Sequence, residues 1–194
     1  TEVTVSVTPL DPALEGTGFP VQVEPGVVTE VPLDAGAEAE SGVALADGMY
    51  TVTMTADQPI VGGIRISAAA DTGEAQTDGP VEAPVSDLAW HAAASPLTGD
   101  TLVTVAPGPD PVLAAANPGP AEVSLLLEAQ GGADITLVVP AGGSASTQLV
   151  AGTTYVLREP AGLSVAISYA SDDRMAAYPV TPARPVSGPI VIRP

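Results

Sequence analysis

The stretch Glu2-Val3-Thr4-Val5-Ser6-Val7 decides the fold class, because valines alternate strictly with polar residues. Successive side chains of a strand point to opposite faces, so this pattern is typical of a strand with one face in a core and one in water. Valine and threonine are also β-branched, which favours strands over helices. The stretch Glu122-Val123-Ser124-Leu125-Leu126-Leu127 has a similar form. Together the two stretches predict an all-β protein.

Short apolar runs recur along the chain, and glycine and proline separate most of them. The chain contains 20 glycines and 21 prolines, and the prolines argue against long helices. Residues 88–94 could form one helical turn or an extended approach to Pro96. We predict further strands near residues 21–23, 29–33, 50–54, 60–66, 102–105, 112–115, 135–139, 147–150, 155–157, 163–169 and 190–192. Short strands at such spacing are typical of β-sandwiches.

An internal repeat organises these strands. Five blocks recur in the same order, so that Tyr50 corresponds to Tyr155, Gly26 to Gly142 and Trp90 to Tyr178. A repeat that preserves order over five blocks indicates duplication of a folding unit. We therefore predict two tandem immunoglobulin-like β-sandwich domains related by internal duplication, over residues 1–87 and 88–194.

The two copies differ at their edges. Strands at residues 102–105 and 112–116 come before the Glu122 stretch, whereas this sequence opens with the equivalent of that stretch. The run Ile190-Val191-Ile192-Arg193 corresponds to Leu102-Val103-Thr104-Val105 in the repeat. We therefore expect an open edge in the first domain, which the strand at residues 189–194 could complete.

The charge balance argues against several classes of function. The chain has 23 acidic and 5 basic residues, a net charge of -18, and its basic residues are scattered arginines. Binding to nucleic acid or to an anionic membrane needs clustered cations, so we expect neither partner. Residues 1–87 hold 15 acidic residues and a single arginine, which we interpret as a solubilising surface.

The scarcity of some residue types excludes several kinds of chemical site. The chain has no cysteine and one histidine, which excludes disulfides, thiolate metal sites and a multi-histidine metal site within one chain. No apolar run is long enough for a membrane helix, so we expect no membrane insertion by this segment.

Catalytic motifs are weak, and we assign no catalytic residue. Asp71-Thr72-Gly73 matches an aspartic-protease motif, but that chemistry needs two such carboxylates and the motif occurs once. His91 lies between Asp87 and Ser95, but no Gly-x-Ser-x-Gly turn accompanies them. A glycosidase needs aromatic walls as well as paired carboxylates, and aromatic residues make up only 3% of the chain.

Trp90 and Tyr178 are the candidate binding residues. A scarce aromatic side chain can stack on a ligand, or it can fill a core or an interdomain contact, and we favour the second interpretation. Asp71, Glu74 and Asp78 form a weak set of calcium ligands, because Ca²⁺ prefers carboxylate oxygens. We expect no other cofactor.

Several blocks resemble a known family. They are Asp87-Leu88-Ala89-Trp90, Ser95-Pro96-Leu97, Leu113-Ala114-Ala115-Ala116-Asn117-Pro118-Gly119, Val139-Pro140-Ala141-Gly142 and Ser168-Tyr169. Together they resemble an uncharacterised actinobacterial family whose members look like exported or membrane-anchored envelope proteins with repeated β-rich domains of unknown function. The resemblance implies an extracellular or cell-envelope location, with any signal or anchor outside this segment.

These observations favour a non-enzymatic structural or protein-interaction module of the bacterial cell envelope. Its partner would be an envelope protein or polymer. Two alternatives stay open. The first is a module that binds carbohydrate or a cell-wall polymer through Trp90, and the second is an enzyme of unrecognised type.

Overall fold

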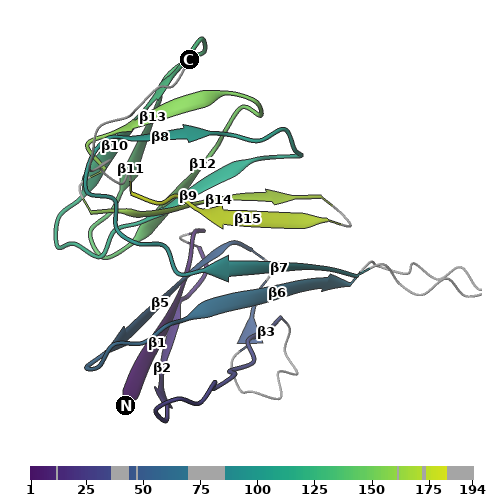
Figure 1. Ribbon diagram of the computed structural model, residues 1–194, viewed down its shortest axis with the longest axis vertical. Coiled ribbons are helices and arrows are strands. Elements are labelled where there is room, and N and C mark those ends of the chain that lie inside the picture. The colour runs from purple at the N-terminus through teal and green to yellow at the C-terminus, as the bar shows by residue number, and fades with distance from the viewer. Residues whose placement is uncertain are drawn as a thin grey trace, which may run out of the picture.

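The computed structural model describes residues 1–11, 13–35, 44–46, 48–69, 86–160, 162–171 and 174–182. Within these ranges the protein consists of fifteen strands and the loops between them (Figure 1). The prediction of an all-β fold is therefore confirmed. The same ranges contain no helix that could cross a membrane.

The strands from β8 onward form two four-stranded sheets, which we call the second unit. The sheet orders are β11-β10-β13-β8 and β12-β9-β14-β15 (Figure 1). The strands are β8 (Thr101–Thr104), β9 (Val112–Ala116), β10 (Val123–Ala129), β11 (Ile135–Val139), β12 (Ser144–Gln148), β13 (Thr154–Arg158), β14 (Ser164–Ala170) and β15 (Met175–Pro179). Every pairing in these two sheets is antiparallel.

One hydrophobic core lies between these sheets, and strand alternation builds it. In β10, Leu125 and Leu127 are fully buried, whereas Ser124 and Glu128 face solvent. Leu113 and Ile167 of the other sheet join the same core. Complete burial of such a side chain contributes roughly 1.5–3 kcal/mol, so this core is the main source of stability of the second unit.

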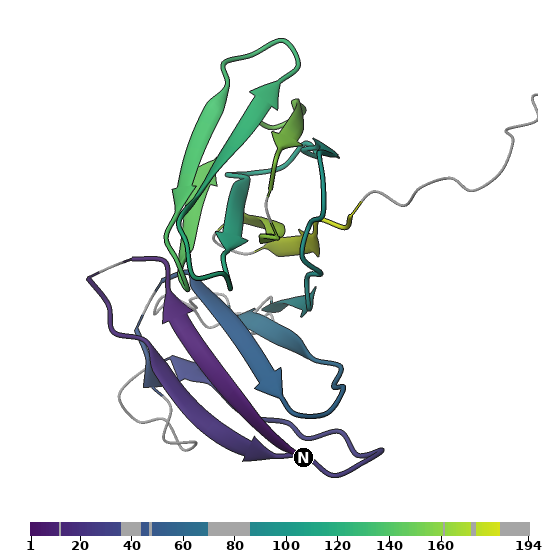
Figure 2. The ribbon, with the colours of Figure 1, turned by 90° about the vertical axis from the view of Figure 1, so that its left-hand side faces the viewer.

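The N-terminal strands form a smaller assembly, which we call the first unit (Figure 2). One sheet has the order β2-β1-β5, and β6 and β7 form an antiparallel hairpin. Their bounds are β1 (Glu2–Pro9), β2 (Thr17–Gln22), β5 (Tyr50–Ala56), β6 (Gly63–Ala69) and β7 (Ser86–Ala92), with a short parallel pair of β3 (Asp34–Ala35) and β4 (Ala44–Leu45). The buried core residues are Val3, Val5 and Val7.

The observed secondary structure decides two predictions about short segments. The predicted strand at residues 29–33 is wrong, because this segment is irregular and Val31 lies exposed. Pro32 cannot donate a backbone hydrogen bond, which weakens any strand there. Residues 88–92 belong to β7, so the extended alternative is confirmed and the helical turn is wrong.

Strand pairing is alike in the two units. β1 pairs with β2 and β5, as β10 pairs with β11 and β13. Val7 lies opposite Val52, and Leu127 lies opposite Leu157, which is the same register once the repeat is aligned. The antiparallel pair of β6 and β7 forms a sheet of its own, whereas the antiparallel pair of β14 and β15 continues a four-stranded sheet through β9.

The two units differ beside these central strands. β13 pairs with β8 on its second side, whereas β5 is the last strand of its sheet among the described residues. Tyr155 and Leu157 on β13 are therefore almost wholly buried. Their equivalents on β5, Tyr50 and Val52, are only partly buried, so the core of the first unit is less closed on this side.

The units meet where β7 lies alongside β15, and both strands run in the same direction (Figure 1). The chain then enters the second unit, where Leu97 is fully buried and its N–H donates to the Leu163 carbonyl over 2.9 Å. The predicted boundary between residues 87 and 88 falls inside β7. Because β7 pairs with β6, its hydrogen bonds associate it with the first unit.

Candidate functional site

Trp90 lies on an exposed face of the β6–β7 hairpin. Its side chain is 63% exposed, and Leu88, two residues earlier on the same face, is 50% exposed. Across the hairpin, Arg65 lies opposite Trp90 and Ser67 lies opposite Leu88, and both are exposed. We call Arg65, Ser67, Leu88 and Trp90 the Trp90 face.

The alternation of inward-facing and outward-facing side chains along β7 explains this exposure. Ala89 is buried and His91 is half-buried, so the alternation of the strand turns its small residue inward and its indole outward. Burial lowers the pKa of His91, which disfavours its charged form. The favoured interpretation of Trp90 as a packing residue is therefore wrong, and its role in binding stays a prediction.

Tyr178 has a different environment from Trp90. It lies on β15 and packs against the core of the second unit. Its ring centroid is 6.3 Å from that of Tyr169, and its hydroxyl donates to the Thr104 carbonyl over 3.3 Å. Burial raises the pKa of Tyr178. These contacts give Tyr178 a packing role, so Trp90 is the better candidate for binding.

A polar contact joins the start of β7 to the start of β15. The N–H of Met175 donates to Asp87 Oδ2 over 2.7 Å, and the N–H of Leu88 donates to Asp87 Oδ1 over 2.8 Å. These two hydrogen bonds, with a smaller contribution from the charge of Arg174, lower the pKa of Asp87. Asp87 therefore helps to hold the hairpin that carries Trp90 against the second unit.

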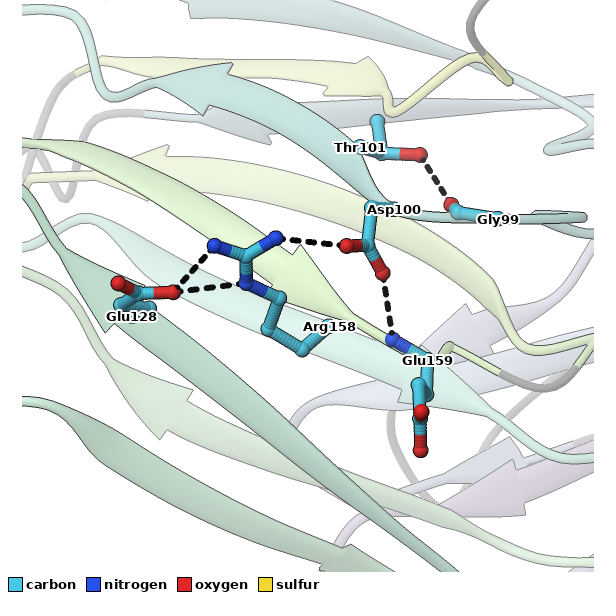
Figure 3. A network of polar contacts seen from close by, with 6 residues as sticks. All are labelled: Gly99, Asp100, Thr101, Glu128, Arg158 and Glu159. Atoms are coloured by element: carbon cyan, nitrogen blue, oxygen red, sulfur yellow. Dashed lines mark hydrogen bonds and ion pairs between the residues drawn. The ribbon is translucent and has the colours of Figure 1, made fainter.

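A second polar cluster connects β10, β13 and the loop that precedes β8 (Figure 3). Arg158 forms ion pairs with Asp100 over 2.7 Å and with Glu128 over 2.6 Å. Asp100 also accepts a hydrogen bond of 3.0 Å from the N–H of Glu159. The hydrogen bonds from Glu159 and Arg158 lower the pKa of Asp100. Each acidic group is thus paired with the guanidinium, which favours a structural role over acid–base chemistry.

The predicted calcium ligands Asp71, Glu74 and Asp78 lie outside the described residues, so that prediction is not tested. Among the residues that are described, no group of three histidine, cysteine or acidic side chains could hold a metal ion.

Sequence reasoning found Trp90 but missed its neighbours. Arg65 lies beside the indole only through the register of the hairpin, and Leu88 shares its face through the two-residue alternation of β7. Arg158, Asp100 and Glu128 were also missed, because 58 and 30 residues of sequence separate the arginine from its partners. No local signal identifies such a cluster until the strand pairing is known.

The Trp90 face is thus the best candidate for a binding surface among the described residues, and its chemistry combines an indole, an aliphatic side chain and one cation. Comparison of the chain with protein-family models, curated proteins and solved structures found no match.

Proposed function

We propose that the chain is a non-enzymatic structural or protein-interaction module of the bacterial cell envelope, located outside the cytoplasm. The proposal depends most on the exposure of Trp90, the only tryptophan of the chain, beside Leu88. Tryptophan is enriched among the residues that dominate binding energy, because its ring buries a large area on contact. The Trp90 face would therefore be the contact with the partner.

The proposed architecture is two tandem immunoglobulin-like domains that arose by duplication. The matching register of β1 with β5 and of β10 with β13 supports this interpretation. The extracytoplasmic location depends on the resemblance to actinobacterial envelope proteins. The net charge of -18 favours a neutral or basic partner, since an acidic surface would be repelled.

The first experiment is capture of partners from a cell-envelope extract by the immobilised chain. We expect Trp90→Ala and Leu88→Ala each to reduce capture of the specific partner, by about tenfold or more in affinity for Trp90→Ala. Val28→Ala is the matched control, since Val28 is an exposed apolar residue in an irregular segment. If all variants capture the same proteins equally well, the Trp90 face is not the contact surface.

The exposed indole also favours a second candidate, a module that binds carbohydrate or a cell-wall polymer. A tryptophan can stack on a sugar ring, and Arg65 and Ser67 beside it offer hydrogen-bonding groups. Soluble cell-wall fragments should then change the fluorescence of Trp90 saturably. Sugar binding should be more sensitive to Arg65→Ala than to Leu88→Ala, whereas a protein contact should show the reverse order.

A further inference from the structure

Two acidic residues, Asp110 and Glu159, have a backbone conformation that residues other than glycine rarely adopt. Their φ angles are 40° and 48°, and no other non-glycine residue that the structure describes has a positive φ. Each of them directly precedes a proline, Pro111 or Pro160. The proline ring restricts the preceding residue toward extended conformations, so both positions hold backbone strain.

The structure on both sides of Asp110 imposes this conformation. On the N-terminal side, the backbone of Gly108 lies against the ring of the buried Tyr169. On the C-terminal side, Pro111 is buried, and its carbonyl accepts a hydrogen bond of 2.8 Å from the N–H of Leu149. Backbone strain persists only where the surrounding structure maintains it, and it is concentrated at functional sites.

The side chain of Asp110 has the chemistry to break the peptide bond that follows it. Carboxyl groups act as nucleophiles in covalent catalysis, and an attack within one residue is favoured by proximity. The ring formed by attack of an aspartate carboxyl on its own backbone carbonyl has five members. Asp110 is exposed, so water reaches it. We propose that the bond between Asp110 and Pro111 is a self-cleavage site of the folded chain.

The reaction has two steps and consumes one water molecule. A carboxyl oxygen of Asp110 bonds to the backbone carbonyl carbon of the same residue. The bond from that carbon to the nitrogen of Pro111 breaks, and the carboxyl proton passes to this nitrogen. Water then opens the resulting cyclic anhydride, which gives back the side-chain carboxyl and leaves a new C-terminal carboxyl. Because cleavage frees the backbone of Asp110, the strain is lost along the reaction, which lowers the barrier.

The cut lies between β8 and β9, and the fold should keep the two fragments together. β8 belongs to the fragment of residues 1–110 and pairs with β13 of the fragment of residues 111–194. Leu97 of the first fragment is part of the core that the second fragment mostly forms, and its N–H donates to the Leu163 carbonyl. The product is therefore a nicked chain whose two parts separate on unfolding.

The chain contains four bonds between an acidic residue and proline, which separate the effect of the side chain from that of the backbone. They follow Asp11, Glu24, Asp110 and Glu159. Asp11 has the same side chain as Asp110 but no positive φ, and Glu159 has the positive φ but would need a six-membered ring. Glu24 has neither feature. The unmodified protein thus carries its own matched controls.

The experiment is incubation of the folded chain in a mildly acidic buffer, which supplies the protonated carboxyl, followed by mass spectrometry of the fragments. Circular dichroism verifies that the chain is folded in this buffer. We expect cleavage after Asp110 to be about tenfold faster or more than cleavage after Asp11. Cleavage after Glu159 and Glu24 should be slower than after either aspartate. Equal rates after Asp110 and Asp11 in the folded chain would overturn the proposal.

Unfolding provides an independent control, because it removes the backbone strain and keeps the sequence. In the same buffer with urea, the bonds after Asp110 and Asp11 should be cleaved at similar rates. Faster cleavage after Asp110 in urea than in the folded chain would also contradict the proposal. Asp110→Gly should abolish cleavage at this bond while the chain still folds, because glycine tolerates the positive φ. The test does not involve the Trp90 face, so its result is independent of the proposed function.

Discussion

The ring of Tyr169 packs directly against the backbone of Gly108. There is room for the hydrogen atom of glycine at that position but not for a side chain. A Cβ at residue 108 would lie 2.7 Å from Tyr169 Cδ1, well inside normal contact distance. Tyr169 is itself buried and stacks with Tyr178. The glycine therefore determines where both rings lie.

We expect Gly108→Ala to destabilise the protein by about 1–3 kcal/mol, because the added methyl group overpacks this site. Chemical denaturation followed by circular dichroism measures the change. Gly99→Ala is the control, since a Cβ there meets no atom within 4 Å. Equal stability of the two variants would show that Tyr169 moves aside without cost.

The carboxylate of Asp87 should make stability depend on pH. Its pKa is lowered below the ordinary value of 3.8 by the Met175 and Leu88 N–H groups. A group with a depressed folded-state pKa contributes stability above its unfolded pKa and loses it as the pH falls through the folded value. Asp87→Asn should therefore lower Tm at neutral pH, and the difference from the wild type should shrink below about pH 4.

Thermal unfolding at a series of pH values checks this prediction. Asp57→Asn is the matched control, because Asp57 is exposed and has no hydrogen bond among the described residues. A difference between Asp87→Asn and the wild type that stays constant down to pH 2 would contradict an electrostatic role for Asp87.

At the scale of the element, β10 shows how one strand separates a core from a surface. Leu126 and Leu127 are neighbours with the same side chain, but Leu127 is fully buried and Leu126 points outward. β10 pairs with β11 and β13 and is thus a central strand of its sheet. The two leucines should therefore contribute differently to stability, because they lie on opposite faces of the strand although their side chains are identical.

We expect Leu127→Ala to lower the free energy of unfolding by about 2–5 kcal/mol, the usual cost of a cavity in a packed core. Leu126→Ala should change it by about 0.5 kcal/mol or less, as for a surface substitution. Urea denaturation of both variants provides the measurement. A large loss for Leu126→Ala would indicate that the outer face of this sheet is covered by something else.

At the scale of the whole molecule, the two units have similar strand pairing but unequal cores. The core of the second unit includes buried residues from both of its sheets. The first unit has three buried valines and a set of partly buried neighbours. Since burial of apolar area is the dominant stabilising term, the first unit should be the less stable part.

Native-state hydrogen exchange should reveal this difference. We expect the paired amides of β1 to exchange at least about tenfold faster than those of β10, because the less buried sheet opens at lower free energy. Leu127→Ala should make the exchange rates of the β1 and β10 amides more similar. Equal protection of β1 and β10 in the wild type would show that the units unfold as one cooperative body.

The candidate site could be predicted from the sequence only in part. Trp90 could be identified as a candidate because it is the only tryptophan. Its orientation could not be predicted, because the run Leu88-Ala89-Trp90-His91-Ala92 has no clear alternation of polar and apolar residues. Both faces of this strand carry apolar residues, so the sequence could not show which face points inward. The neighbours of Trp90 and the partners of Arg158 depend on strand register, which local residue patterns do not specify.

The sequence alone determined the all-β class and the placement of most strands, because β-branched composition and two-residue alternation act over a few neighbouring residues. Only the tertiary structure decided that Trp90 is exposed, that β8 pairs with β13, and that β5 has a free edge among the described residues. These features depend on contacts between residues far apart in the chain, where packing of whole strands outweighs local preference.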